Sequence, residues 1–198
     1  DRMNSISSAR EQADQLRELL ERIAQQPDLL DTLDRICRTV VEALAAGGKV
    51  LTLGNGGSAT DALHLAEELI GRYRTDRAPL PAVCLSADVS ALTCIANDFG
   101  YDAVFERQVQ ALGRPGDVVI GFSTSGNSPN VNRAFGAARA AGATTIGMLG
   151  KTGGAARDLV DLAWVVPHDN TARIQELHTL ALHAICEAVE ARFGLSST

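Results

Sequence analysis

The sequence predicts a doubly wound α/β fold: a five-stranded parallel sheet with helices on both faces and two extra helices before the first strand. From residue 49 onward, short apolar runs alternate with helical patterns, which is typical of parallel strands joined by crossover helices. Two helical patterns precede the first of these runs. The chain has 198 residues, 45% hydrophobic and 21% charged, so we expect one domain with a buried core.

Two amphipathic helices open the chain. In the first, over residues 9–25, apolar residues recur at spacings of three and four. These residues are Ala13, Leu16, Leu20 and Ile23. Pro27 interrupts the pattern, and we expect Asp28 to cap a second helix that stops at Gly47. Such helices need a surface to lie on, either their own domain or another subunit.

The rest of the chain divides into strands and helices. The expected strands are 49–53, 82–85, 117–122, 144–149 and 162–166. The expected helices are 59–73, 88–96, 101–112, 130–141 and 171–193. We expect a single domain over residues 1–198, in which residues 1–47 form the N-terminal helices and residues 48–198 form the sheet core and the C-terminal helix.

Composition and charge restrict the possible functions. The chain has 18 Lys and Arg against 24 Asp and Glu, a net charge of −6, which argues against a general nucleic-acid binder. It has neither an apolar run as long as a membrane span nor an apolar signal core, so we expect a cytoplasmic protein without a membrane partner.

The four cysteines form no CxxC pair, and we expect reduced, buried thiols. They are Cys37, Cys84, Cys94 and Cys186.

Two polar loops follow expected strands and open helices. The first is Gly54-Asn55-Gly56-Gly57-Ser58, and the second is Ser123-Thr124-Ser125-Gly126-Asn127-Ser128. Both should emerge at the carboxyl edge of the sheet, where open α/β folds bind ligands. Free amides at a helix start attract anions, and hydroxyl groups can donate to phosphate oxygens.

Each loop alone is equally well explained as a tight strand-to-helix turn. Two such loops at one edge favour a phosphate site. The second loop matches neither GxxxxGK[ST] nor GxGxxG, so we expect no nucleotide cofactor.

Helical spacing groups further polar residues. His64 and Glu68 are four residues apart, so they share one helix face, and Gln175 and His183 lie two turns apart on the last helix. Histidine and carboxylate ligands suit zinc, and an amide oxygen can complete such a site. A lone histidine on an amphipathic helix is more often a surface or hydrogen-bonded residue, and we interpret His168 and His178 in this way.

These motifs resemble those of a known family. GNGGS before a helix and STSGNS after a later strand resemble the sugar isomerase (SIS) domain. Three more segments resemble one branch of it, the phosphoheptose isomerases. They are HLAEELIGRY from His64, ANDFG from Ala96 and ARIQELH from Ala172.

The resemblance implies an SIS-type fold and an aldose-ketose isomerase. The implied reaction converts sedoheptulose 7-phosphate to D-glycero-D-manno-heptose 7-phosphate through an enediol, for heptose glycan precursors. The resemblance also implies a zinc ion held by His64, Glu68, Gln175 and His183. We expect Glu68 to act as the base, since a carboxylate shielded from water can be tuned for this role, and His183 as the acid.

The expected substrate contacts come from both loops and from three other segments. They are Asn55, Gly56, Gly57, Ser58, Glu68, Asn97, Asp98, Ser123, Thr124, Ser125, Ser128 and Gln175. For Asn97 and Asp98 an Asx turn is the alternative interpretation. Arg72 either reaches the phosphate or is a solvated helix-end residue.

Related proteins that are not isomerases leave alternatives open. Scaffolds that bind a replication initiator protein share GNGGS, STSGNS and the Ala-Arg-Ile-Gln segment, and a sugar-phosphate sensor is a third possibility. Ala59 and Ala172 stand where some isomerases have His and Asp. The run from Glu67 to Tyr73 and the acidic charge favour the enzyme. We expect a homotetramer with sites at subunit boundaries, where the last helix meets a neighbour's first loop.

Overall fold

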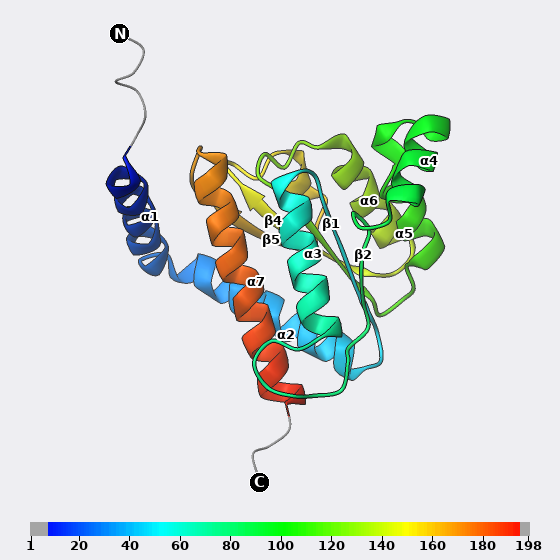
Figure 1. The fold of residues 1–198 in the computed structure, drawn as a ribbon, viewed down its shortest axis with the longest axis horizontal. Helices are drawn as coiled ribbons and strands as arrows, with labels where there is room; N and C mark the ends of the chain where they lie inside the picture. Colours follow the sequence, from blue (N-terminus) through cyan, green and yellow to red (C-terminus); the bar gives the residue numbers. More distant parts are fainter. Residues whose placement is uncertain (1–7, 195–198) are drawn as a thin grey trace.

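The computed structural model describes residues 8–194, so residues 1–7 and 195–198 of the expected domain lie outside the described residues. Within 8–194, all strands form one parallel sheet in the order β2-β1-β3-β4-β5 (Figure 1). The strands are β1 (Val50–Gly54), β2 (Ala82–Cys84), β3 (Val118–Ser123), β4 (Thr144–Gly150) and β5 (Leu162–Val166). The strand order reverses between β1 and β3, and open α/β sheets bind ligands at such a point.

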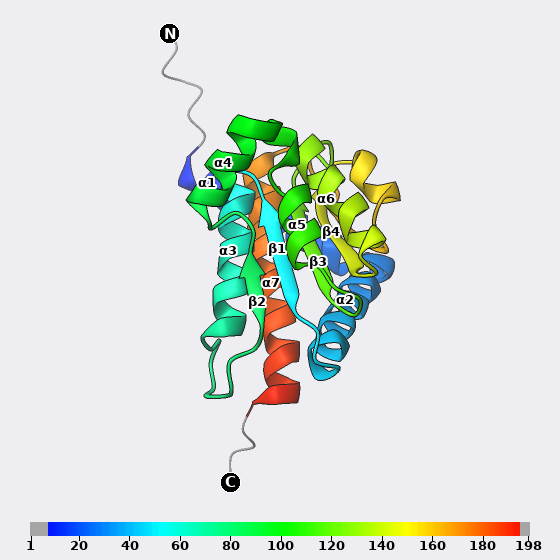
Figure 2. The ribbon, with the colours of Figure 1, turned by 90° about the vertical axis from the view of Figure 1, so that its right-hand side faces the viewer.

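Helices cover both faces of the sheet, as predicted (Figure 2). One face packs against α2 (Pro27–Ala45), α3 (Gly57–Ile70) and α7 (Thr171–Phe193). The other face packs against α5 (Glu106–Leu112) and α6 (Pro129–Ala140). Side chains of β3 alternate between the two cores, because successive residues of a strand point to opposite faces.

Helix α1 (Ala9–Ala24) stands outside the sheet, beside α7 (Figure 1). It begins with a capping box, in which Ser8 Oγ accepts from Glu11 N at 3.2 Å and Glu11 Oε2 accepts from Ser8 N at 2.6 Å. The buried Arg173 of α7 donates from Nη1 to Gln12 O at 2.7 Å. The first helix therefore lies partly on α7 of its own domain.

Some helix boundaries differ from the expected ones. The expectation that Asp28 caps α2 is wrong: Pro27 is the first helical residue, and Asp28 lies in the first turn. Helix α3 ends at Ile70 and not at Tyr73. The buried Arg77 accounts for this end, because its guanidinium donates to Glu68 O at 2.6 Å and to Leu69 O at 2.9 Å, two carbonyls that the helix leaves open.

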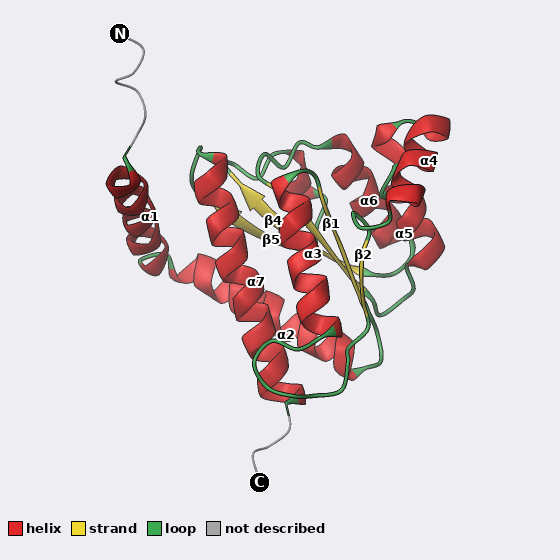
Figure 3. Cartoon of the chain, in the orientation of Figure 1, coloured by secondary structure: helices red, strands yellow, loops and turns green. Residues whose placement is uncertain are grey.

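The predicted helix over 101–112 is two elements, a 3₁₀ turn η2 (Tyr101–Ala103) and α5 (Figure 3). A second such turn, η3 (Ala155–Asp158), lies between β4 and β5. Helix α4 (Val89–Phe99) is longer than expected and is capped by Asp88 Oδ1, which accepts from Ala91 N at 2.9 Å.

The cysteine prediction is confirmed for three residues and wrong for one. All four thiols are free, and Cys37, Cys84 and Cys186 are buried. Cys94 is exposed, because it lies on α4 and none of the residues of that helix is buried. In residues 8–194, no helix combines the length and apolar character that a bilayer crossing requires.

Candidate active site

The two polar loops meet at one cavity of about 180 Å³ at the carboxyl ends of β1 and β3. The cavity is lined by Asn55, Ser58, Phe122, Ser123, Thr124, Ser125, Ser128, Thr171 and Gln175. The structure thus brings together seven of the expected substrate contacts. Helices α3, α6 and α7 all begin here, and helix N-termini attract anions.

Two lining residues, Phe122 and Thr171, are not among the contacts predicted from the sequence. Phe122 is an ordinary apolar strand residue, so no local signal marked it. Thr171 is the first residue of α7, behind Asn170, whose Oδ1 accepts from Ala172 N at 2.9 Å. An Asn-Thr pair at a helix start is a signal that could have indicated a hydroxyl in the site.

Hydrogen bonds hold the two loops in place before any ligand binds. Asn55 Nδ2 donates to Asn130 Oδ1 at 2.9 Å, and Asn130 Nδ2 donates back to Asn55 Oδ1 at 2.8 Å. Tyr101 Oη also donates to Asn55 Oδ1, at 2.9 Å. In the second loop, Ser125 Oγ accepts from Asn127 N at 3.1 Å. A preorganised loop binds an anion without first ordering its own side chains.

Backbone packing explains one glycine of the second loop. Gly126 has φ +65°, and a Cβ there would collide with the backbone of Gly153 in the loop after β4. Ala156 N also donates to Gly126 O at 2.9 Å. The loop after β4 therefore packs against the second polar loop and holds Gly126 in place.

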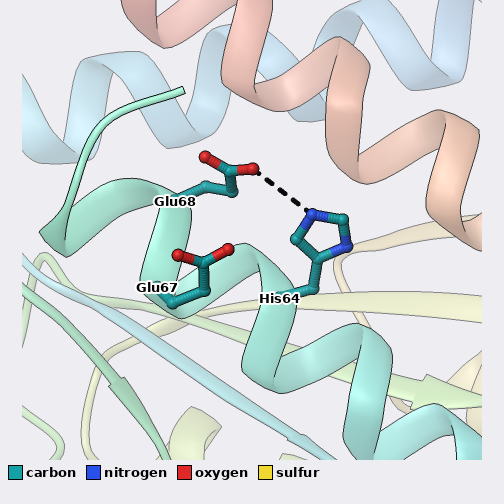
Figure 4. Close-up of side chains that lie close together, drawn as sticks. All are labelled: His64, Glu67 and Glu68. Carbon is teal, nitrogen blue, oxygen red and sulfur yellow. Dashed lines mark hydrogen bonds and ion pairs between the residues drawn. The ribbon is translucent and has the colours of Figure 1, made fainter. Parts of the chain in front are cut away.

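A second group of polar residues lies further along α3 and α7. His64 Nε2 lies 3.3 Å from Glu68 Oε1 on α3 (Figure 4). The His183 ring of α7 meets the His64 ring edge-on, with centroids 5.1 Å apart. Tyr73, from the segment after α3, also contacts His183, with ring centroids 5.6 Å apart. We call His64, Glu68 and His183 the acid–base cluster.

The donor atoms here fit a divalent cation. Ligand atoms of His64, Glu67 and Glu68 all lie within 4.8 Å of one another, and Figure 4 shows the exposed Glu67 beside the other two. Imidazole nitrogen and carboxylate oxygen are typical ligands of divalent metals. Glu67 is not among the metal ligands expected from the sequence, although its place directly before Glu68 was an available signal.

Gln175, the fourth expected metal ligand, lies apart from this cluster. Its side chain lies against Gly57 and lines the loop cavity. His183 is eight residues further along α7, or about 12 Å along the helix axis. The last helix therefore meets the first loop of its own chain, and no neighbour is needed for that contact.

Asn97 and Asp98 lie exposed in the last turn of α4, so the Asx-turn alternative is wrong. Asn97 Nδ2 donates to Asp98 Oδ1 at 2.7 Å. Neither residue lines the loop cavity. Tyr101, just after this helix, bonds to Asn55, so the end of α4 lies near the first loop. Arg72 is exposed in the segment after α3.

Two buried groups near the site have perturbed pKa values. Burial raises the pKa of the Asp61 carboxyl, a shift that the hydrogen bond from Thr179 reduces. Burial lowers the pKa of His178 from 6.5 to about 4, although its Nε2 lies 3.0 Å from Leu149 O. His178 packs between the rings of Phe122 and Trp164. It is a hydrogen-bonded core residue, in agreement with the sequence interpretation.

Comparisons with known proteins agree with this architecture. The SIS domain family model matches residues 12–150. The phosphoheptose isomerase of Pelobacter propionicus is 51% identical over 174 residues, which cover 88% of this chain and 91% of that protein. The phosphoheptose isomerase of Geobacter sulfurreducens is 51% identical over 176 residues, 89% of this chain and 88% of that protein. A solved phosphoheptose isomerase from Neisseria gonorrhoeae superposes with a TM-score of 0.83 at 41% identity, covering 93% of this chain and 100% of that one.

Proposed function

The chain belongs to the SIS domain family and, within it, to the phosphoheptose isomerases, and from this membership we propose that it converts sedoheptulose 7-phosphate to D-glycero-D-manno-heptose 7-phosphate. The product would supply heptose glycan precursors. The observation that carries the proposal is that one pair of helices, α3 and α7, joins a cavity lined by hydroxyls of the two polar loops to the group His64, Glu68 and His183.

In the proposed mechanism the loop cavity binds the phosphate. Hydroxyls of Ser123, Thr124, Ser125 and Ser128, together with loop amides, donate to its oxygens. Gly56 and Gly57 let the backbone approach the ligand. Asn97 and Asp98 then bond to hydroxyls of the sugar chain.

The chemistry moves the carbonyl from C2 to C1. Glu68 removes a proton from C1, and His183 protonates the oxygen on C2, which gives an enediol. Return of a proton to C2 and loss of the proton on O1 give the aldose, so no oxidant, reductant or nucleotide cofactor is needed. Gln175 orients the substrate oxygens from the cavity side.

We also propose that zinc binds here, through His64, Glu68 and His183. Gln175, the fourth expected ligand, lies at the loop cavity about 12 Å along α7 from His183 and is not part of this group. The fit of the donor group around His64 and Glu68 supports this assignment. When bound, zinc would polarise the oxygens on C1 and C2. It would also occupy a lone pair that Glu68 needs as the base, so the ion would either leave one carboxylate oxygen free or act as a stabilising or inhibitory occupant. A cytoplasmic location is part of the same proposal, favoured by the free, buried thiols.

The proposed assembly is a homotetramer with sites at subunit boundaries. Helix α4 supports it: this helix is apolar, yet none of its residues is buried, and Val89 and Phe99 are 70% and 54% exposed. Asn97 and Asp98 lie on the same helix, so a second copy docked there would lie beside expected substrate contacts. A light-scattering mass equal to one 20.9 kDa chain at micromolar concentration would overturn this assembly.

The deciding experiment is turnover. Purified protein is incubated with sedoheptulose 7-phosphate, and the aldose is followed by proton NMR, with Glu68→Gln as the inactive reference. We expect the aldose to form with the wild type only. Binding of sedoheptulose 7-phosphate without turnover would overturn the isomerase and favour a sensor, and capture of a replication initiator by the inactive protein would favour a scaffold.

A further inference from the structure

Helices α3 and α7 lie side by side and run in the same direction (Figure 1). Paired positions contact one another along their length, and the pairs are Gly57 with Gln175, Asp61 with Thr179, and His64 with His183. The first pair borders the loop cavity, and the last belongs to the acid–base cluster. The middle pair, Asp61 and Thr179, has no role in the mechanism described above.

Asp61 is an unusual residue for a helix–helix contact. Asp61 is only 8% exposed, and its Oδ1 accepts from Thr179 Oγ1 at 3.1 Å. Its other oxygen, Oδ2, is buried and has no hydrogen-bond partner within residues 8–194. A buried, half-satisfied carboxylate destabilises a folded protein, so its presence between two functional groups requires an explanation.

The Thr179 hydroxyl has two acceptors and one proton. Besides Asp61 Oδ1, Gln175 O lies 3.1 Å from Thr179 Oγ1. A hydroxyl donates one hydrogen bond at a time. Without Asp61, Thr179 therefore satisfies itself within α7, and the hydrogen bond that joins α7 to α3 at this level is lost.

Thr179 also occupies a specific place on α7. It lies one turn after Gln175 and one turn before His183, on the face that meets α3. A bond at this level fixes both neighbouring pairs against sliding or rotation of α7.

We propose that Asp61 is a positioning residue of the isomerase: through Thr179 it fixes α7 against α3 and so holds His183 against His64. The inference rests on the proposed function, because positioning matters only if these residues act on substrate. The phosphate loops do not depend on this bond, so substrate binding should change little. Turnover should fall, since misplacement of reacting groups by about 1 Å can cost up to a hundredfold.

The primary test compares Asp61→Ala with Asp61→Asn. In Asp61→Ala we expect kcat to fall roughly tenfold to a hundredfold, with KM within about twofold of the wild type. We expect the melting temperature to stay level or rise, because the unsatisfied carboxylate is removed. Asp61→Asn retains an oxygen that can accept from Thr179, so it should recover most of kcat. A merely structural role predicts that kcat and melting temperature fall together, and that outcome would overturn the proposal.

Thr179→Val tests the route through Thr179. It should reproduce the kcat loss of Asp61→Ala, and the double variant should lose nothing further, because both changes remove one bond. Thr39→Val is the matched control: Thr39 Oγ1 donates to Arg35 O at 2.9 Å within α2, away from the site, and kcat should not change. Wild-type kcat in Asp61→Ala or in Thr179→Val would overturn the proposal.

NMR signals of the histidine rings separate this inference from the proposed function. If the wild type does not turn over sedoheptulose 7-phosphate, the proposed function fails, but the ring signals of His64 and His183 still report their packing. Asp61→Ala should shift these signals and leave those of His168 unchanged. Unshifted His64 and His183 signals would show that Asp61 does not position the cluster.

Discussion

The side chain of Gln175 lies directly against Gly57, where it occupies the space that a Cβ would need: an added Cβ would come within 2.5 Å of Gln175 Nε2. One residue thus joins the last helix to the first loop. Gly57 begins α3, and Gln175 lies more than a hundred residues later in the chain. Their contact sets the orientation of the Gln175 amide toward the loop cavity.

Gly57→Ala is therefore expected to displace Gln175 without unfolding the protein. The clash falls on the flexible end of a side chain, and alanine is a better helix residue than glycine, so the melting temperature should hold or rise. Turnover should fall roughly tenfold to a hundredfold. The matched control is Gly136→Ala in α6, where an added Cβ meets nothing within 4 Å. Unchanged turnover in Gly57→Ala would show that Gln175 has no role in the reaction.

Ser125→Ala should weaken substrate binding. The hydroxyl lines the loop cavity, and loss of a charge-assisted phosphate partner costs about 1–3 kcal/mol. Calorimetric titration with sedoheptulose 7-phosphate measures the change, and Thr39→Ala in α2, away from the cavity, is the control. Equal affinity of Ser125→Ala and the wild type would contradict the phosphate assignment.

Glu68→Gln should abolish exchange of the carbon-bound proton with solvent. The amide keeps the shape of the side chain but cannot accept a proton from C1, so the enediol does not form. Phosphate binding should stay largely intact, because the loop cavity is unchanged. Incubation in deuterated water followed by NMR or mass spectrometry gives the incorporation rate, with the exposed Glu18→Gln on α1 as control. Incorporation at the wild-type rate would reassign the base.

His178 should make the protein less stable in acid. Its pKa in the folded protein is about 4, below the ordinary 6.5, so the unfolded chain binds the proton more tightly. The free energy of unfolding is therefore highest above pH 6.5, where His178 is neutral in both states. It falls as the pH drops from 6.5 toward 4, by about 3 kcal/mol in total. Denaturant unfolding at several pH values measures this loss. His178→Gln, which cannot titrate, should flatten the profile, and an unchanged slope would exclude His178 as its source.

Local patterns were enough to predict the sheet, the two loops and seven of the nine residues that line the cavity. Strands such as 117–122 and loops such as Gly54–Ser58 carry their signals within a few residues. The parallel direction of the strands also follows from such signals, because helices separate the strands along the chain. The predicted position of the loops at one edge agrees with the cavity that Asn55 and Ser125 share.

Contacts between distant segments could not be predicted in this way. Nothing near Asn130 indicates that it pairs with Asn55, and nothing near Tyr73 indicates that it packs on His183. The end of α3 depends on Arg77, which reaches back to two carbonyls from beyond the helix. Cys94 was expected to be buried because its neighbours are apolar, but α4 leaves that face uncovered.

The two edges of the sheet have a consequence for aggregation. Edge strand β2 has only three residues, so it offers few unpaired backbone groups to a strand from another molecule. The other edge strand, β5, packs one of its faces against α2, where Trp164 Nε1 donates to Leu29 O at 3.2 Å. A fully parallel sheet is slow to form and exposes its edges while folding. The short edge at β2 limits the templates for misassembly, so a concentrated solution of the folded protein should resist growth of intermolecular β-structure from that edge.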